Sequence, residues 1–195
     1  KSEYSYRNSF NGMTVPMTQS EAIEVAKLPG VVRITRDQSH ALETDRGPAF
    51  IGATTIWDGS AMEGLGGVGS QGEGMLVGII DSGINGDHPA VKATGGDGYE
   101  HINPFGDGVF VGECFDTPDL ICNNKLVGRY NMVASADSSE DEDGHGTHVA
   151  STAAGNVLAG VPLPDADGNA QDYPLGTMSG VAPHANIVAF RVCHQ

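Results

Sequence analysis

One apolar run that ends on an acid constrains the fold of this chain more than any other feature. The run is MLVGIID (75–81), and a glycine-rich turn follows it directly. A compact apolar run of this kind is typical of a buried strand in a parallel sheet. KLVGRYNMV (125–133) and ANIVAFRV (185–192) predict two more strands, and HGTHVASTAAG (145–155) predicts a helix of mostly small residues. Small side chains let such a helix pack close to a sheet. Strands of this kind together with that helix predict an α/β fold.

The carboxyl end of the first strand places Asp81 in a loop. Functional groups of open α/β sheets collect at this edge, which makes Asp81 a candidate site residue. The alternative is that Asp81 only caps the turn formed by the following Ser82-Gly83 pair. The strand pattern alone leaves both roles open.

The segment DGHGTHVA (143–150) holds two histidines three residues apart. A metal site would use Asp143, His145 and His148 but would need further ligands, and the zinc motif HExxH is absent because no Glu follows His145. A catalytic site needs fewer assumptions. Asp81 would hold one ring nitrogen of His145, and the other nitrogen would take a proton from a hydroxyl group. We therefore expect His145 to be an acid/base group, with a metal hydrolase as the alternative.

The charge balance excludes two classes of partner. The 195 residues include 10 Lys and Arg against 25 Asp and Glu, a formal net charge of −15. Phosphate backbones and anionic membrane surfaces repel such a chain, so we expect neither nucleic acid nor membrane as a partner. No apolar run approaches the roughly 20 residues that a membrane-spanning helix needs.

Three cysteines are present, and two of them lie close together in CFDTPDLIC (114–122). A turn that contains proline would bring Cys114 and Cys122 within bridging distance, which predicts a local disulfide. The alternative is two free buried thiols, because spacing alone does not prove a bridge. Cys193 is left without a partner, and we expect its partner in sequence downstream of this chain.

The first 37 residues follow a separate pattern. An Asn11-Gly12 pair lies between two short segments rich in aromatic and β-branched residues, which predicts a hairpin. TQSEAIEVAKLPG (18–30) begins with the spacing of a capping box and predicts a helix that stops at Pro-Gly. VVRITRD (31–37) predicts a third strand. Residues 38–58 are polar and irregular, as expected of an exposed connection.

Three blocks resemble, in this order, those of subtilisin-like serine peptidases, peptidase family S8. The blocks are VGIIDSGINGDHP (77–89), DGHGTHVASTAAG (143–155) and SGVAPHANIVAFRV (179–192). The resemblance implies a subtilisin-like, mostly parallel sheet flanked by helices, truncated in this chain, and a serine-type endopeptidase. Asp81 would then orient and stabilise the imidazole, and His145 would act as general base and then as general acid.

The N-terminal segment resembles the propeptide of the same family. Residues 10–37 resemble the second half of an inhibitor-type (I9) propeptide, a small α+β ferredoxin-like fold that acts as chaperone and inhibitor of its own enzyme. TDRGPAFIGA (44–53) resembles the mature start of the secreted branch that includes the plant enzymes. The resemblance therefore implies maturation cleavage between Glu43 and Thr44.

The implied organisation has three parts. Residues 1–37 are a partial propeptide, residues 38–58 are the processing linker and mature N-terminus, and residues 59–195 are the N-terminal part of a catalytic domain. The implied partners are a protein or peptide substrate and the chain's own propeptide. The implied form is a secreted, extracellular zymogen.

The departures from the family pattern concern the nucleophile. It lies in Gly-Thr-Ser-Met-Ala-x-Pro at the start of a later helix in this family, and no such block occurs here. GTMSGVAP (176–183) imitates it, but Ser179 is displaced by one position and precedes a strand, so we interpret Ser179 as a loop residue. The oxyanion Asn is expected beyond Gln195, and His148 is expected to be structural. This chain alone should therefore be an inactive piece of a serine endopeptidase. The alternative to the endopeptidase is a non-catalytic peptide- or calcium-binding domain on a subtilase scaffold.

Calcium is the one cofactor that the resemblance leaves open. The family's common site takes a carboxylate shortly after a His-Pro pair, but the stretch that begins at His88 has an alanine where that Asp is expected. The acidic segments DSSEDED (137–143) and DADGNAQD (165–172) are the remaining candidates. For both segments a solvated acidic loop is the favoured interpretation, and a calcium site is the alternative.

Overall fold

The computed structural model describes residues 4–7, 11–37, 46–160, 162–164, 170–174 and 176–193. The chain divides into two compact units, residues 1–41 and residues 42–195.

The first unit contains the predicted hairpin and the predicted helix. Strands β1 (Tyr4–Tyr6) and β2 (Gly12–Thr14) pair in antiparallel fashion. Gly12 is already part of β2 and lies opposite Tyr6, so the Asn-Gly pair leads into the second strand. Helix α1 (Gln19–Val25) begins with a complete capping box, because the Thr18 side chain accepts from the Glu21 amide and the Glu21 carboxylate accepts from the Thr18 amide.

The predicted third strand of this unit is wrong. Residues 31–37 form no regular element, and the side chain of Val32 is 99% exposed. A strand needs a neighbour that pairs with its backbone N–H and C=O groups. Among the residues described in this unit, β1 and β2 pair only with each other, so residues 31–37 have no such neighbour.

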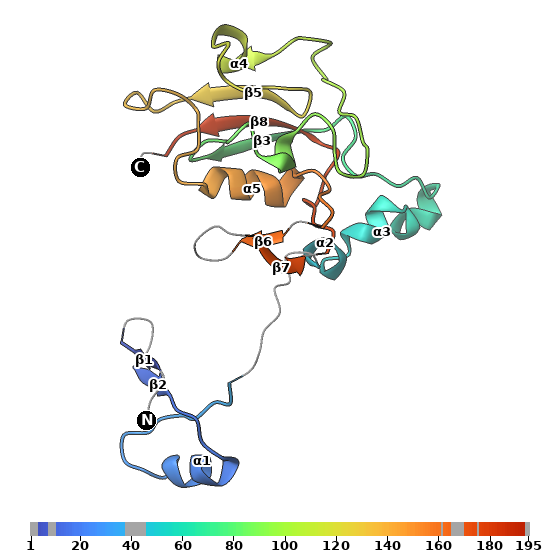
Figure 1. Ribbon diagram of the computed structural model, residues 1–195. Coiled ribbons are helices and arrows are strands. Elements are labelled where there is room, and N and C mark those ends of the chain that lie inside the picture. The colour runs from blue at the N-terminus through green and yellow to red at the C-terminus, as the bar shows by residue number, and fades with distance from the viewer. Residues whose placement is uncertain are drawn as a thin grey trace. The chain divides into compact units, whose positions relative to one another are not determined.

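The centre of the second unit is a four-stranded parallel sheet, as Figure 1 shows. Its order is β3-β8-β5-β4, and every neighbouring pair is parallel. The strands are β3 (Leu76–Asp81), β8 (Asn186–Arg191), β5 (Leu126–Asn131) and β4 (Val111–Gly112). The three predicted strands and the predicted α/β fold class are therefore confirmed.

Helix α5 (His145–Ala154) packs against β3 and β8 and covers the core. The predicted helix of small residues is confirmed, and its Ala150 and Ala154 are completely buried. Their short side chains let the helix approach the sheet closely, so that aliphatic side chains from three strands fill the space between them. The core consists of Ile79, Ile84, Val91, Leu126, Ala150, Ala154, Ala185, Ile187 and Ala189.

Strand β3 is parallel as predicted, but it is buried on one face only. Val77 and Ile79 pack with the core, whereas Leu76 and Ile80 are 43% and 69% exposed. Successive side chains of a strand point to opposite faces of the sheet, so Leu76 and Ile80 point away from α5. The prediction of a fully buried strand is wrong for that face.

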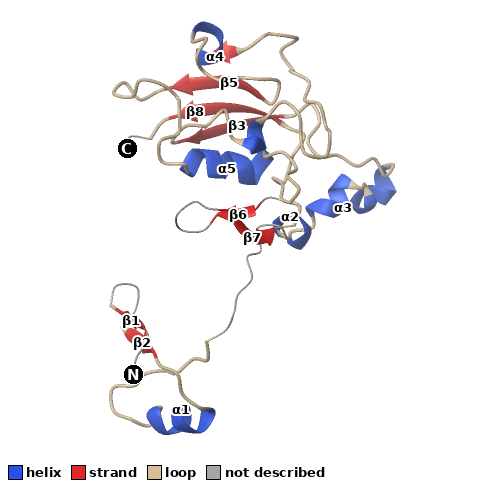
Figure 2. Ribbon diagram, viewed as in Figure 1, coloured by secondary structure: helices blue, strands red, loops and turns tan. Residues whose placement is uncertain are grey.

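The remaining elements are short. Residues 46–58 are not irregular as predicted, because they contain α2 (Gly47–Phe50) and α3 (Ala53–Trp57), shown as helices in Figure 2. The proline in the first turn of α2 lacks an amide N–H, which is no loss at a position where that group has no helical partner. The others are α4 (Glu113–Asp116), β6 (Pro162–Pro164), β7 (Ala170–Pro174) and 3₁₀ helices Ser60–Leu65 and Pro89–Val91. None of the helices described here is long and apolar enough to cross a membrane.

Candidate active site

Asp81 is the last residue of β3, at the carboxyl edge of the parallel sheet. The Ser82 amide donates a hydrogen bond of 2.8 Å to its Oδ1. The Asp81 side chain is 16% exposed, so the carboxylate faces a partly dry environment. Loops at this edge of an open α/β sheet are the usual place for functional groups, and Asp81 lies there as the sequence predicted.

His145 is the first residue of α5, and its ring meets Asp81. His145 Nδ1 lies 2.7 Å from Asp81 Oδ1, a hydrogen bond between residues 64 apart in sequence. Two glycines permit this approach. Gly144 has a φ of 86°, in the left-handed region, and a Cβ on Gly146 would collide with the carbonyl oxygen of Gly83.

The electrostatics of the pair favour a charged imidazole beside a charged carboxylate. The hydrogen bond to Asp81 and the charge of Asp81 raise the pKa of His145 above its ordinary value, and the charges of Asp143 and Asp141 add to the effect. Burial raises the pKa of Asp81, but hydrogen bonds from His145 and the Ser82 amide lower it by more. When Nδ1 donates to Asp81, Nε2 is the nitrogen that accepts a proton.

Sequence reasoning missed a second polar network behind this pair. The Ser82 hydroxyl donates to Asp141 Oδ1 at 2.8 Å, and Thr147 donates to Asp141 Oδ2 through its amide at 2.7 Å and its hydroxyl at 2.6 Å. The one available signal was an Asp four residues before His145, ahead of a glycine that has no side chain to cap the helix. The acidic composition of the segment obscured that signal.

The metal-site alternative needs His145 and His148 to bind the same ion, but the two histidines have different surroundings in the structure. His145 is hydrogen-bonded to Asp81. His148 is exposed, so the expectation of a structural role, with its side chain packed in the fold, is wrong. Across the described part of the chain, no group of three or more His, Cys, Asp or Glu side chains is arranged to hold a metal ion.

Ser179 lies at the wrong end of α5 to meet His145. It follows Met178, which pairs with Leu158, and the next residue, Gly180, donates its amide to the carbonyl of Gly155 at the C-terminal end of the helix. His145 begins that helix, and ten residues at 1.5 Å rise span roughly 15 Å. The interpretation of Ser179 as a loop residue is therefore confirmed.

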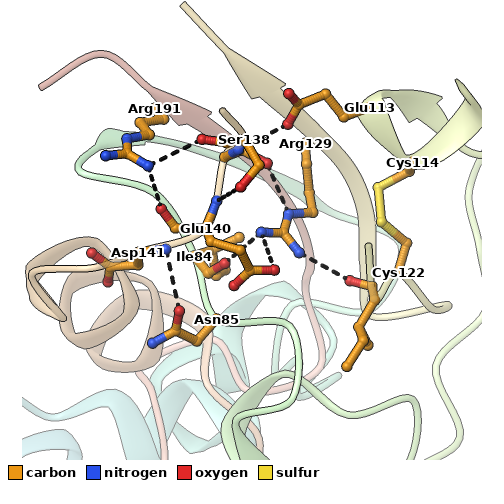
Figure 3. A network of polar contacts seen from close by, with 12 residues as sticks. Ile84, Asn85, Glu113, Cys114, Cys122, Arg129, Ser138, Glu140, Asp141 and Arg191 are labelled. Atoms are coloured by element: carbon orange, nitrogen blue, oxygen red, sulfur yellow. Dashed lines mark hydrogen bonds and ion pairs between the residues drawn. A yellow bond between two sulfur atoms is a disulfide. The ribbon is translucent and has the colours of Figure 1, made fainter. Parts of the chain in front are cut away.

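The acidic segment 137–143 is not simply a solvated loop, which is one of the two interpretations that its sequence allows. Its Glu140 pairs with the buried Arg129 at 2.9 Å, and its Glu142 pairs with Arg191 at 3.2 Å. Figure 3 shows the guanidinium groups of both arginines turned toward this loop. The other calcium candidate, residues 165–172, lies largely outside the described residues.

The predicted disulfide is present. Cys114 and Cys122 are bridged, with their Cα atoms 5.8 Å apart, and the bridge lies beside the arginine network in Figure 3. Cys193 is an exposed free cysteine. The predicted processing site, Glu43 and Thr44, lies outside the described residues.

Comparison with known proteins finds two families along the chain. The subtilase family matches residues 72–195, and peptidase inhibitor I9 matches residues 1–43. Similar proteins include the Arabidopsis thaliana subtilisin-like proteases SBT1.4 (30% identical over 208 residues), SBT4.3 (35% over 189) and SBT3.16 (35% over 207). Each alignment covers 97% of this chain but only 24%, 23% and 25% of the respective relative. The chain thus spans about a quarter of the length of these proteins.

The subtilase match covers more than half of the chain and includes both Asp81 and His145. The parallel sheet with its covering helix has the architecture that the resemblance implied. With an inhibitor I9 segment in its first 43 residues, the chain belongs to the subtilase family of serine peptidases.

Proposed function

We propose that this chain supplies the Asp and His of a Ser/His/Asp triad to a secreted subtilisin-like serine endopeptidase. The observation that carries the proposal is the 2.7 Å hydrogen bond between His145 Nδ1 and Asp81 Oδ1. It joins a strand end to a helix start across 64 residues and leaves Nε2 directed away from the carboxylate. The 62% exposure of the His145 side chain leaves room for a nucleophile and a substrate beside it.

The proposed mechanism is nucleophilic acyl transfer to a serine. His145 Nε2 takes the proton of the serine hydroxyl as its oxygen attacks the scissile carbonyl, and later gives that proton to the leaving amine. Asp81 holds the imidazole in the required tautomer and stabilises the imidazolium that forms. The raised pKa of His145 is in the direction that favours the imidazolium.

We assign the nucleophile and the oxyanion donor to sequence outside these 195 residues. The absence of a Gly-Thr-Ser-Met-Ala block from the chain supports this assignment, as does the fourfold greater length of the relatives. Ser179 is not the nucleophile in this account, because it lies near the opposite end of α5 from His145.

The 195-residue chain, purified alone, should cleave neither casein nor a peptide ester. A triad without its nucleophile and oxyanion donor loses most of its rate. The measurement is hydrolysis by the chain at micromolar concentration, with Ser179→Ala as the matched variant. Activity that Ser179→Ala abolishes would refute the assignment of the nucleophile to another part of the protein.

We further propose that the chain is a zymogen segment, divided as 1–37, 38–58 and 59–195, with cleavage between Glu43 and Thr44. The end of the inhibitor I9 match at residue 43 supports this position. N-terminal sequencing of the processed complete protein should give Thr44 as the first residue. A start beyond residue 60 would rule out the proposed cleavage site.

The released propeptide would act as chaperone and inhibitor of the site, and a protein or peptide chain would be the substrate. Secretion is supported by the Cys114–Cys122 disulfide, because such bonds persist in oxidising compartments.

A further inference from the structure

The helix that begins with His145 has no N-cap side chain of its own. Its N-cap residue is Gly144, which makes no side-chain capping hydrogen bond. The first amide groups of any helix lack partners within the helix, and a buried amide without a partner destabilises the fold. In α5 two of these groups, the amides of Gly146 and Thr147, are satisfied by side chains from outside the helix.

Ser82 and Asp141 supply the missing caps. The Gly146 amide donates to the Ser82 hydroxyl oxygen at 2.8 Å, and the Thr147 amide donates to Asp141 Oδ2 at 2.7 Å. Asp141 Oδ1 also accepts from the Gly144 amide at 2.9 Å. A carboxylate at a helix N-terminus is further stabilised by the helix dipole.

Ser82 also contacts the carboxylate that holds His145, and it links Asp141 to that carboxylate. Ser82 follows Asp81, donates its amide to Asp81 Oδ1, and donates its hydroxyl to Asp141 Oδ1 at 2.8 Å. The Ser82 hydroxyl therefore connects the strand that ends at Asp81 with the helix that starts at His145.

Asp141 is itself held firmly. Asp141 is 5% exposed, and this burial raises the pKa of its carboxyl group. Hydrogen bonds from Thr147, Ser82 and the Gly144 amide lower that pKa by more, so the carboxylate stays ionised. The loop before it is fixed by the buried Arg191, whose Nη1 donates to the carbonyls of Ser138 and Glu140 at 3.1 and 2.9 Å (Figure 3).

We propose that Asp141 is a positioning residue for the Asp81–His145 pair, acting through the cap that it forms on α5 together with Ser82. This inference rests on the proposed function. The His145 ring is 62% exposed, so packing does not fix its place. Its distance to Asp81 depends instead on where the first turn of α5 is held, and a displacement of about 1 Å costs about a hundredfold in rate.

The first test is NMR spectroscopy of the isotope-labelled 195-residue chain. Asp141→Ala should weaken or abolish the downfield Nδ1–H signal of His145 that reports the bond to Asp81. The matched control is Asp143→Asn, because Asp143 also raises the pKa of His145 through its charge. The control should lower that pKa and leave the Nδ1–H signal in place, which separates positioning from electrostatics.

The second test is kinetic and uses the complete protease. Asp141→Ala should lower kcat by about ten- to a hundredfold and change KM by less than about twofold, because the loss is of alignment and not of substrate contact. Asp141→Asn keeps the volume and one acceptor oxygen but turns an amide N–H₂ toward a backbone N–H. Its effect should have the same direction and be smaller.

The outcomes separate this inference from the proposed function. If Asp141→Ala does not fold, Asp141→Asn decides the question. Folded Asp141 variants with the wild-type Nδ1–H signal and kcat within about twofold of wild type would overturn the positioning role. A complete wild-type protein without serine peptidase activity would overturn the proposed function, and the NMR experiment would still decide the role of Asp141.

Discussion

Replacing Arg129 with methionine should destabilise the second unit by about 3–5 kcal/mol. Arg129 is completely buried on β5, and its guanidinium group donates to Ile84 O at 2.8 Å and to Ser139 Oγ at 3.0 Å, while it pairs with Glu140 at 2.9 Å. Methionine fills much of the volume but satisfies none of these acceptors. The loss is large because the buried carbonyl of Ile84 and the buried hydroxyl of Ser139 remain without their donor.

Urea unfolding followed by tryptophan fluorescence measures this effect. Trp57 is the only tryptophan in the chain, and its indole donates to Val181 O within the second unit, so its emission reports this unit. Lys92→Met is the matched control, because Lys92 is exposed and its removal should change the free energy of unfolding by less than about 0.5 kcal/mol. A loss below about 1 kcal/mol for Arg129→Met would contradict the role of Arg129.

Asp81→Asn in the complete protease should lower kcat by about 10⁴-fold. The amide keeps the size of the carboxylate, but it cannot stabilise the imidazolium and no longer selects the tautomer with hydrogen on Nδ1. The control is Glu63→Gln, because Glu63 is an exposed carboxylate outside the Asp81–His145 pair. Its kcat should remain close to that of the wild type. A loss of less than about tenfold for Asp81→Asn would be incompatible with the proposed triad.

The pH dependence of activity in Asp81→Asn should shift in one defined direction relative to the wild type. Asp81 raises the pKa of His145, and only the neutral imidazole acts as the base, so wild-type activity falls as the pH drops through that raised pKa. Without the carboxylate the pKa of His145 returns toward its ordinary value. The acid limb of the residual activity should therefore move to lower pH.

The elements marked by local patterns were predictable from the sequence. β3 and β8 each contain a contiguous apolar run, β5 begins with apolar residues, and α5 is a run of small residues closed by glycine, so each carries its own signal. The segment 31–37 has the same kind of signal without a described neighbour to pair with, and it is not a strand. Strand formation depends on a partner that composition does not reveal.

The candidate site was predictable only in part. Asp81 and His145 stand in blocks that resemble a known family, and the fold brings their side chains together. The hydrogen bond from Ser82 to Asp141 joins residues 59 apart in sequence, and the one local signal, an acid four residues before His145, does not identify Ser82 as its partner. Asp141 was one of several acids in a charged segment, and only the fold distinguishes the buried cap from its exposed neighbours such as Asp137.

Labelling of the complete protein with a fluorophosphonate probe shows whether Asp81 and His145 activate a serine. The probe should modify one serine that lies outside residues 1–195, and His145→Ala should abolish the labelling while a chelator leaves it unchanged, because the activated serine depends on the imidazole. Mass spectrometry of the modified peptide identifies the residue. Labelling of Ser179 or any other serine of this chain, or labelling that survives His145→Ala, would contradict the claim that Asp81 and His145 activate a nucleophile supplied by the rest of the protein.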